Sequence, residues 1–273
     1  MAGRTGHYFL LQLKLKHSEN KIKYLANLEN IGWVLCLSNS EIVVKKQIQF
    51  WHKSVPYNCL MSILRYSIVI AGGIVSFIIL AHYLHQHGEL WFDAPILNFL
   101  AKHRTLLLDN FFLWSTWAGS SFVLLPISTG IAVVLIRYRY YPAALLMGIG
   151  FSGASLMTKM IKTLMVRERP ILFPPLEIYG GFSFPSGHTT QVAAFALSVF
   201  LIISRIRPRW QWPASILLTV LVLCVSTSRL YLQVHYPSDI LGGCLVALIW
   251  VFSIDALIRT TIRIGTLKKP GGQ

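Results

Sequence analysis

Acidic residues are scarce in this sequence, with 10 Asp and Glu against 25 Lys and Arg among 273 residues. Charged residues make up 13% of the chain and hydrophobic residues 54%, and the mean hydropathy is +0.57. A soluble domain has about 25% charged residues. This composition therefore excludes a soluble domain and indicates an integral membrane protein. The net charge of +15 does not point to nucleic acid, because many of the basic residues flank apolar runs.

Cysteine is scarce too, with four residues in the chain. Cys36, Cys59, Cys224 and Cys244 have none of the spacings of a metal site, and the last two lie inside apolar runs as small hydrophobic residues. The sequence therefore predicts neither a disulfide framework nor a cysteine-bound metal. No bound cofactor is expected.

Six apolar runs approach the length of about 20 residues that crosses a bilayer as a helix. They cover residues 62–84, 111–136, 141–165, 187–204, 212–230 and 239–258. Between the first two, residues 89–110 mix apolar and charged side chains and are expected to form an amphipathic helix at the membrane interface. The predicted fold class is all-α, a polytopic membrane protein whose six-helix bundle occupies residues 61–273.

Residues 1–60 are rich in Lys and Asn and contain no apolar run of this length. They are expected to form a cytoplasmic extension of the bundle. The alternative is that translation begins at Met61, where the composition changes sharply.

Basic residues in the connections predict the orientation of the spans. On one side lie Arg137, Arg139, Arg205, Arg207, Arg209, Arg259, Arg263, Lys268 and Lys269. By the positive-inside rule this side is cytoplasmic and holds both termini, so the connections 166–186 and 231–238 face outward. Four basic residues near these two connections break the rule, namely Lys162, Arg167, Arg169 and Arg229. Such an exception indicates an anionic ligand on the outer side.

The first of three polar motifs runs from Lys162 to Arg169-Pro170. Lys162 and Arg169 lie on one helix face, about 10 Å apart along the axis, if the helix persists until Pro170 ends it. A planar Arg fork and a Lys point charge suit phosphate oxygens, although one such side chain alone commonly snorkels to lipid head groups. Arg167 and Glu168, within this segment, are expected to form a solvated pair.

The second motif, Pro185-Ser186-Gly187-His188, leads directly into an apolar run. The backbone N–H groups near Ser186 and Gly187 then lie at a helix N-terminus, which is a ready anion site. The Ser186 hydroxyl adds a donor, and His188 is placed to exchange a proton with a bound group. A lone His at a membrane interface is usually only a polar end group, but two His in such contexts favour chemistry.

The third motif combines Arg229, at the end of the fifth run, with His235 and Asp239 at the start of the sixth. The Asp239 carboxylate can accept a hydrogen bond from one ring nitrogen of His235, which leaves the other nitrogen basic and aimed. A second role of Asp239, as a favourable charge at a helix N-terminus, is compatible with this. In the assembled set, cations and a helix N-terminus hold a phosphoryl group, His235 attacks it, and His188 protonates the leaving oxygen. Because the cations supply the charge stabilisation, no metal is needed.

Together the three motifs resemble the signatures of the type 2 phosphatidic acid phosphatase superfamily, the integral membrane lipid phosphatases. They match as Lys162 with six residues to Arg169-Pro170, Pro185-Ser186-Gly187-His188, and Ser228-Arg229 with five residues to His235 and three to Asp239. This resemblance, which covers residues 61–270, implies a six-helix membrane bundle and a phosphohistidine intermediate on His235. It also implies that Asp239 orients His235 and that His188 acts as general acid and then as base. The phosphate ligands that it implies are Lys162, Arg169, Ser186, Gly187 and Arg229.

A site at the outer membrane surface favours an amphiphilic substrate, a lipid phosphate or a lipid diphosphate. Within the resemblance the candidates are undecaprenyl diphosphate, phosphatidylglycerophosphate and phosphatidic acid. The small chain favours a bacterial enzyme of the inner membrane, with undecaprenyl diphosphate as the first candidate. Phosphotransfer to a lipid acceptor is an alternative with the same motif residues. The alternative of another class is an anion transporter or an anion-binding membrane protein. The gathering of the polar residues at one face argues against it.

Overall fold

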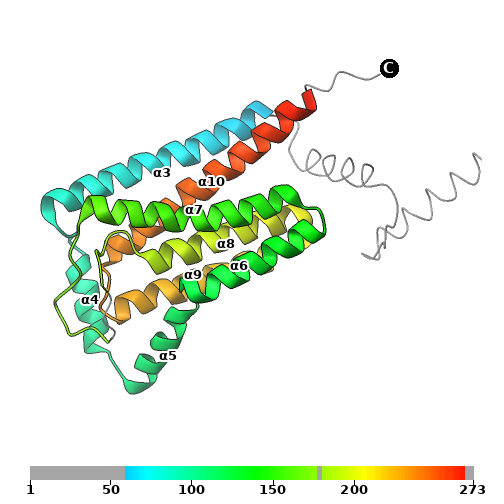
Figure 1. Cartoon of the computed structure of the whole chain (residues 1–273). Helices are drawn as coiled ribbons and strands as arrows, with labels where there is room; N and C mark the ends of the chain where they lie inside the picture. Colours follow the sequence, from blue (N-terminus) through cyan, green and yellow to red (C-terminus); the bar gives the residue numbers. More distant parts are fainter. Residues whose placement is uncertain (1–58, 177–179, 268–273) are drawn as a thin grey trace, which may run out of the picture. The chain divides into compact units, whose positions relative to one another are not determined.

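The computed structural model describes residues 59–176 and 180–267, which form helices and connections without any strand (Figure 1). The helices are α3 (Cys59–His87), α4 (Asp93–Lys102), α5 (Leu106–Trp117), α6 (Ser121–Arg137), α7 (Tyr141–Met165), α8 (Gly187–Ile206), the short η1 (Pro208–Trp210), α9 (Gln211–Tyr231) and α10 (Pro237–Leu267). The predicted all-α class is confirmed. The expected extension over residues 1–60 lies outside the described residues up to residue 58, so it stays a prediction.

Five helical segments of the described chain are long and apolar enough to cross a membrane. They are Leu64–His87, Tyr141–Met165, Gly187–Ile206, Pro208–Tyr231 and Pro237–Ile262. A sixth crossing forms only if α5 and α6, which meet at a bend of 42°, count as one span. The expectation of a single helix over 111–136 is therefore wrong, because the structure breaks it at residues 118–120.

The bend between α5 and α6 lies where Gly119 passes α9. A Cβ at Gly119 would come within 2.3 Å of Val225 Cγ1, so glycine is what allows the chain this close. Ser120 follows as the N-cap of α6 in an extended conformation, and Gly/Ser pairs are a common cause of helix kinks. As a result α6 packs along α7 and α8, whereas α5 diverges from the bundle and contacts α9 (Figure 1).

The expected amphipathic helix over 89–110 is also divided. α4 ends at Lys102 and α5 begins at Leu106, with Thr105 between them as an N-cap whose hydroxyl accepts from Leu108 N. The Thr105 N–H donates to the Tyr231 hydroxyl of α9 at 3.2 Å, so this turn is held against the bundle. α4 in turn contacts α9 and α10 and lies at one end of the long helices (Figure 1).

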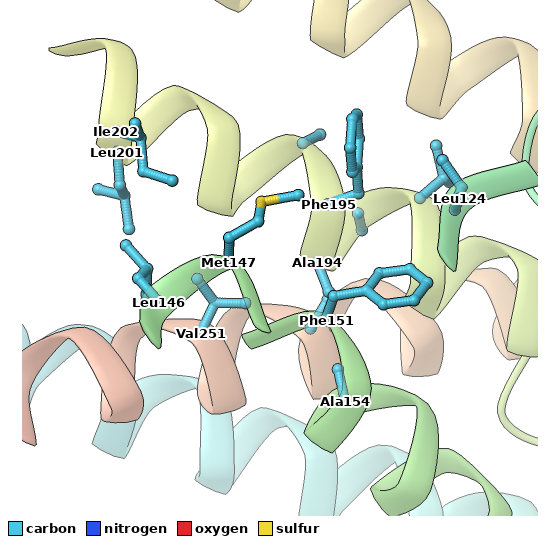
Figure 2. Close-up of a cluster of buried hydrophobic side chains, with 14 of the residues drawn as sticks. Leu124, Leu146, Met147, Phe151, Ala154, Ala194, Phe195, Leu201, Ile202 and Val251 are labelled. Atoms are coloured by element: carbon cyan, nitrogen blue, oxygen red, sulfur yellow. The ribbon is translucent and has the colours of Figure 1, made fainter. Parts of the chain in front are cut away.

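The most enclosed of the long helices is α8, which packs against α6, α7, α9 and α10. Figure 2 shows the middle of this packing, where Met147 and Phe151 of α7 and Val251 of α10 lie near Ala194 and Phe195 of α8. Small residues such as Ala194 let helices approach closely, which matters in a membrane because the hydrophobic effect does not drive helices together there. α8 is therefore the central helix of this packing.

The starts of α8 and α10 approach each other at a pair of glycines. A Cβ at Gly243 would lie 2.9 Å from the backbone oxygen of Ser186, and one at Gly242 would lie 2.4 Å from the ring of Phe184. Across the same contact, Ser186 N donates to the backbone oxygen of Asp239 at 3.0 Å. The two helix starts, which carry the second motif and part of the third, are therefore held in direct contact.

At the far end of the bundle, the buried carboxylate of Asp255 on α10 joins three helices. It accepts hydrogen bonds from Arg205 of α8 at 2.6 Å, from Arg259 at 3.1 Å and from the Tyr66 hydroxyl of α3. A charge in such a place is tolerated when it is paired and hydrogen-bonded. These hydrogen bonds and ion pairs hold α3, α8 and α10 together at the end of the bundle that is distant from the three motifs.

Replacement of Gly243 tests the close approach of α8 and α10. We expect Gly243→Ala to destabilise the protein by about 1–3 kcal/mol, because its methyl group must displace backbone rather than a flexible side chain. Gly130→Ala on α6 is the matched control, since no atom lies within 4 Å of its added Cβ. Thermal unfolding of both variants in one detergent measures the difference, and equal transition temperatures would contradict the expectation.

Candidate active site

The first motif begins on α7 and continues into the connection that follows it. α7 ends at Met165, and Val166 adopts the left-handed conformation with φ of 49° while its N–H donates to Lys162 O. The end expected from the apolar run 141–165 is confirmed, and the condition that would place Lys162 and Arg169 on one helix face is not met. After α7 the chain folds back, because Arg167 O accepts a hydrogen bond from Ser183 N at 2.7 Å. Lys162 thus reaches the site from the helix and Arg169 reaches it from the connection.

Backbone carbonyl groups orient these two cations. Lys162 Nζ donates to the carbonyl oxygens of Phe182 and Ser183. The three nitrogens of the Arg169 guanidinium donate to the carbonyl oxygens of Gly180 (3.2 Å), Gly181 (3.1 Å) and Val234 (2.7 Å). Gly181 has φ of +77°, a conformation that favours glycine. The connection between α7 and α8 therefore curls around both cations and fixes their direction.

The second motif forms the start of α8, where the sequence predicts a helix N-terminus. Ser186 is the N-cap and Gly187 the first helical residue, so the predicted helix N-terminus forms here, although the Ser186 N–H itself donates to Asp239 O at 3.0 Å. Ser186 is fully buried and its hydroxyl accepts from Thr189 Oγ1 at 3.1 Å. His188 follows in the first turn and is half-buried. The Phe184–Pro185 peptide bond before it is cis.

His235 and Asp239 meet at the start of α10. His235 Nδ1 donates to Asp239 Oδ2 at 3.2 Å, and both side chains are buried. The same carboxylate oxygen accepts from Ser183 Oγ and from Tyr236 N at 2.8 Å. Asp239 is the third residue of α10, so its bond to Tyr236 N caps its own helix in the manner of a capping box. One carboxylate therefore holds both the imidazole and the helix start.

The second ring nitrogen of His235 faces a cation, since Arg169 Nη1 lies 3.4 Å from Nε2. A guanidinium only donates hydrogen bonds, so Nε2 is the acceptor and the proton of the neutral ring is on Nδ1. Burial lowers the pKa of His235 from 6.5 to about 3, and the charges of Arg229 and Lys162 add to this effect against that of Asp239. The imidazole is therefore neutral near pH 7, with its lone pair on Nε2.

Arg229 enters the site from the last turn of α9. It is 1% exposed, and its Nη1 donates to the Thr116 hydroxyl of α5 at 2.5 Å. Arg229, His235, Arg169 and Lys162 all lie near enough to His188 to act on it electrostatically. The structure thus brings together every site residue that the sequence predicts: Lys162, Arg169, Ser186, Gly187, His188, Arg229, His235 and Asp239.

Arg167 also belongs to this site, although its sequence context predicts a solvated pair with Glu168. That expectation is wrong for Arg167, whose side chain is buried and donates from Nη1 to Asp239 Oδ1 at 2.6 Å, while Glu168 is exposed. The carboxylate draws the guanidinium inward because a buried charge needs a partner. One signal was present, since Arg167 is among the basic residues that break the positive-inside rule. Ser183, Thr116 and Asp93, which bonds to Arg167, carried no such signal.

The arrangement suits transfer of a phosphoryl group. Lys162, Arg169 and Arg229 act electrostatically on His188 in the first turn of α8, and cations and a helix N-terminus both attract phosphate oxygens. A neutral His235 with its lone pair on Nε2 faces the same space, as the bond to Arg169 shows. Among the described residues, no three side chains of the His, Cys, Asp and Glu types are grouped as metal ligands.

Comparison with known proteins gives matches that agree with this geometry. The PAP2 superfamily matches residues 140–262. Phosphatidylglycerophosphatase B of Bacillus subtilis is 30% identical over 181 residues, which are 65% of this chain and 89% of that protein. An undecaprenyl-diphosphatase of Sulfolobus acidocaldarius is 27% identical over 201 residues, or 71% of this chain and 91% of that protein.

A crystal structure of a transmembrane PAP2-type phosphatidylglycerolphosphate phosphatase from Bacillus subtilis has the same fold. It covers 76% of this chain and 100% of its own, with a TM-score of 0.61 and 26% sequence identity. The region matched to the family, residues 140–262, contains all three polar motifs. The chain therefore belongs to the PAP2 superfamily and is an integral membrane phosphatase.

Proposed function

We propose that the protein hydrolyses a lipid phosphate or lipid diphosphate, without a metal ion, through a phosphohistidine on His235. The observation that carries this proposal is the hydrogen bond from His235 Nδ1 to Asp239 Oδ2. It leaves Nε2 as a nucleophile next to Arg169. A neutral imidazole held in one tautomer by a carboxylate is the arrangement that nucleophilic catalysis by histidine requires.

In the first step the cations Lys162, Arg169 and Arg229 and the start of α8 hold the non-bridging phosphate oxygens. His235 Nε2 attacks phosphorus, and the new N–P bond forms as the P–O bond to the leaving group breaks. His188 donates a proton to the leaving oxygen, and the negative charge of the bound phosphate favours the protonated form of His188 that this step needs. Asp239 stabilises the positive charge that develops on the phosphorylated ring.

In the second step water replaces the lipid alcohol or lipid phosphate. His188, now neutral, takes a proton from the water, whose oxygen attacks phosphorus. The P–N bond breaks, inorganic phosphate leaves, and His235 returns to its neutral form. The cations stabilise the charge on the phosphoryl oxygens in both steps, which is the task that metal ions perform in other phosphoryl transferases.

For the substrate we propose undecaprenyl diphosphate or phosphatidylglycerophosphate, with phosphatidic acid as a further candidate. Two relatives are named for phosphatidylglycerophosphate and undecaprenyl diphosphate, both of them amphiphiles. Trp91, two residues before the first residue of α4, is 83% exposed, and tryptophan favours the membrane interface. The positive-inside pattern supports a site on the outer face of a bacterial inner membrane, with both termini in the cytoplasm.

Release of inorganic phosphate by detergent-purified protein in excess chelator tests the reaction. Undecaprenyl diphosphate, phosphatidylglycerophosphate, phosphatidic acid and a soluble aryl phosphate are compared, and their ranking identifies the substrate class. His235→Ala should lose more than about 10³-fold in kcat because the nucleophile is gone. Asp239→Asn should lose about 10²- to 10⁴-fold because the imidazole loses its tautomer.

The control is Glu168→Gln, an exposed residue between two site cations, which should keep full activity. Release that persists in His235→Ala, or that stops with chelator, contradicts the proposal. Labelled phosphohistidine that forms without release of phosphate indicates phosphotransfer to a lipid acceptor instead. Phosphate binding that is unchanged in His235→Ala, with no release in either protein, indicates an anion-binding membrane protein.

The protonation state of His235 gives an independent prediction. Since burial lowers its pKa to about 3, the ring should stay neutral as the pH falls from 8 to 5 in phosphate-free enzyme, and the nucleophile should not be lost by protonation in this range. ¹⁵N NMR of histidine-labelled protein, with His235→Ala to assign the signals, measures this directly. A His235 titration midpoint near 6.5 would show that the ring is not buried as the structure describes.

A further inference from the structure

We propose that Arg167 and Asp93 are positioning residues of the His235–Asp239 pair, and that Asp93 makes the seating of α4 a condition for an oriented nucleophile. This inference rests on the proposed function in one respect, that His235 is the nucleophile. None of the hydrogen bonds described for Arg167 and Asp93 involves His235 Nε2. Their effect on the reaction is expected to pass through Asp239.

Arg167 lies between two carboxylates. Its Nη1 donates to Asp239 Oδ1 at 2.6 Å, and its Nη2 donates to Asp93 Oδ2 at 3.1 Å. Nη1 also donates to the Ser238 hydroxyl at 2.8 Å. The planar fork of arginine suits this task, because its two terminal nitrogens reach separate acceptors in fixed directions. Arg167 therefore links the two acids as one unit.

Asp93 connects α4 to the start of α10. Its Oδ1 accepts from Ser238 N at 2.9 Å, and its Oδ2 accepts from Ser238 Oγ and from Leu90 N at 3.0 Å. Ser238 is the second residue of α10, so Asp93 caps this helix from a segment 145 residues earlier in the chain. Two acids, Asp93 and Asp239, thus satisfy the first N–H groups of α10, and both are bound to Arg167.

The division of bonds on Asp239 explains how Arg167 acts. Oδ1 receives Arg167, while Oδ2 receives His235 Nδ1, Ser183 Oγ and Tyr236 N. With donors on both oxygens the carboxylate is held in one rotamer and kept ionised, as a hydrogen-bond acceptor for Nδ1–H must be. Without Arg167, two buried carboxylates would face each other through Ser238 with no cation between them, and the Asp239 carboxylate would lose the donor that holds its Oδ1.

The surroundings keep this coupling strong. Asp93 and Asp239 are both 0% exposed and Arg167 is buried, so water does not screen their charges. The ring of Tyr236 lies over the guanidinium of Arg167, 4.1 Å from its carbon to the ring centroid, and covers it. The unit of two acids and one base carries a net negative charge next to His235. This charge favours the imidazolium that forms when the ring is phosphorylated.

Arg167→Gln is the principal test, measured on the full-length protein in detergent. The ¹⁵N signals of His235 should shift from the Nδ1–H tautomer toward the Nε2–H tautomer, because the proton on Nδ1 loses its fixed acceptor. We expect kcat to fall by about 10- to 100-fold, as for other residues that orient a reactive group, and KM to stay within about 3-fold. Arg167→Lys keeps the charge without the fork and should show smaller changes of both kinds.

The double variant Asp93→Asn/Arg167→Gln separates positioning from structural support. It removes the charge of both partners, so it should regain thermal stability relative to Arg167→Gln alone, since the unpaired buried charge is gone. It should not regain the His235 tautomer or the kcat of the natural protein, because Asp239 still lacks Arg167. Asp109→Asn is the matched control: Asp109 pairs with Arg104 at 3.5 Å, and its loss should leave the His235 signals unchanged.

Two results would overturn the inference. One is a His235 tautomer in Arg167→Gln equal to that of the natural protein, and the other is a double variant that recovers both stability and tautomer. Should Arg167→Gln fail to fold, the His235 signals in Arg167→Lys decide in the same way. Failure of the proposed function is seen separately, as absence of phosphate release from the natural protein, and it leaves the ¹⁵N comparison valid.

Discussion

The carboxylate of Asp239 is the group on which the geometry of the site depends. It accepts hydrogen bonds from four groups, two in the connection between α7 and α8 (Arg167 and Ser183) and two in the connection between α9 and α10 (His235 and Tyr236). A buried carboxylate is costly unless all its acceptor positions are used, so Asp239 requires Arg167, Ser183 and His235 to converge. The imidazole of His235 is oriented because its Nδ1–H donates a hydrogen bond to the Asp239 carboxylate. The same bonds place the connection between α7 and α8 next to the start of α10. This connection is the one whose carbonyl groups orient Lys162 and Arg169.

Much of the fold could be predicted from the apolar runs, because a helix that crosses a bilayer needs a length that few other segments reach. The runs over 141–165, 187–204, 212–230 and 239–258 correspond to α7, α8, α9 and α10 within a few residues at most ends. What could not be predicted is the break between α5 and α6. That break lies where Gly119 meets Val225, and hydropathy contains no information on such a contact between distant segments. The fold of the chain after α7 was not predictable for a similar reason, since it goes with a bond from Ser183 N to Arg167 O.

The site residues were predictable to the extent that they stand in spaced motifs. Spacing alone indicated that His235 and Asp239 meet, since residues four apart around a helix start lie on one side. Asp93 was not predictable in this way, because a single acid in an amphipathic segment is the ordinary pattern of an interfacial helix. The scarcity of aspartate in the chain is a further signal that points to Asp93. The chain has four aspartates, and Asp93, Asp109, Asp239 and Asp255 all form ion pairs with arginine in the structure.

The placement of these acids explains why α10 has a central role in both fold and site. Asp239 and Asp255 are 16 residues apart on this helix, which corresponds to about 24 Å of rise and so approaches the thickness of the hydrocarbon layer. Each binds an arginine that comes from another part of the chain, Arg167 at the site end and Arg205 at the other. Between them α10 contacts its neighbours through apolar and small residues. The polar bonds have defined directions, whereas the apolar contacts do not. The two ionic clusters therefore fix the position of α10, and the side chains in the middle of the helix need only match the shape of their neighbours.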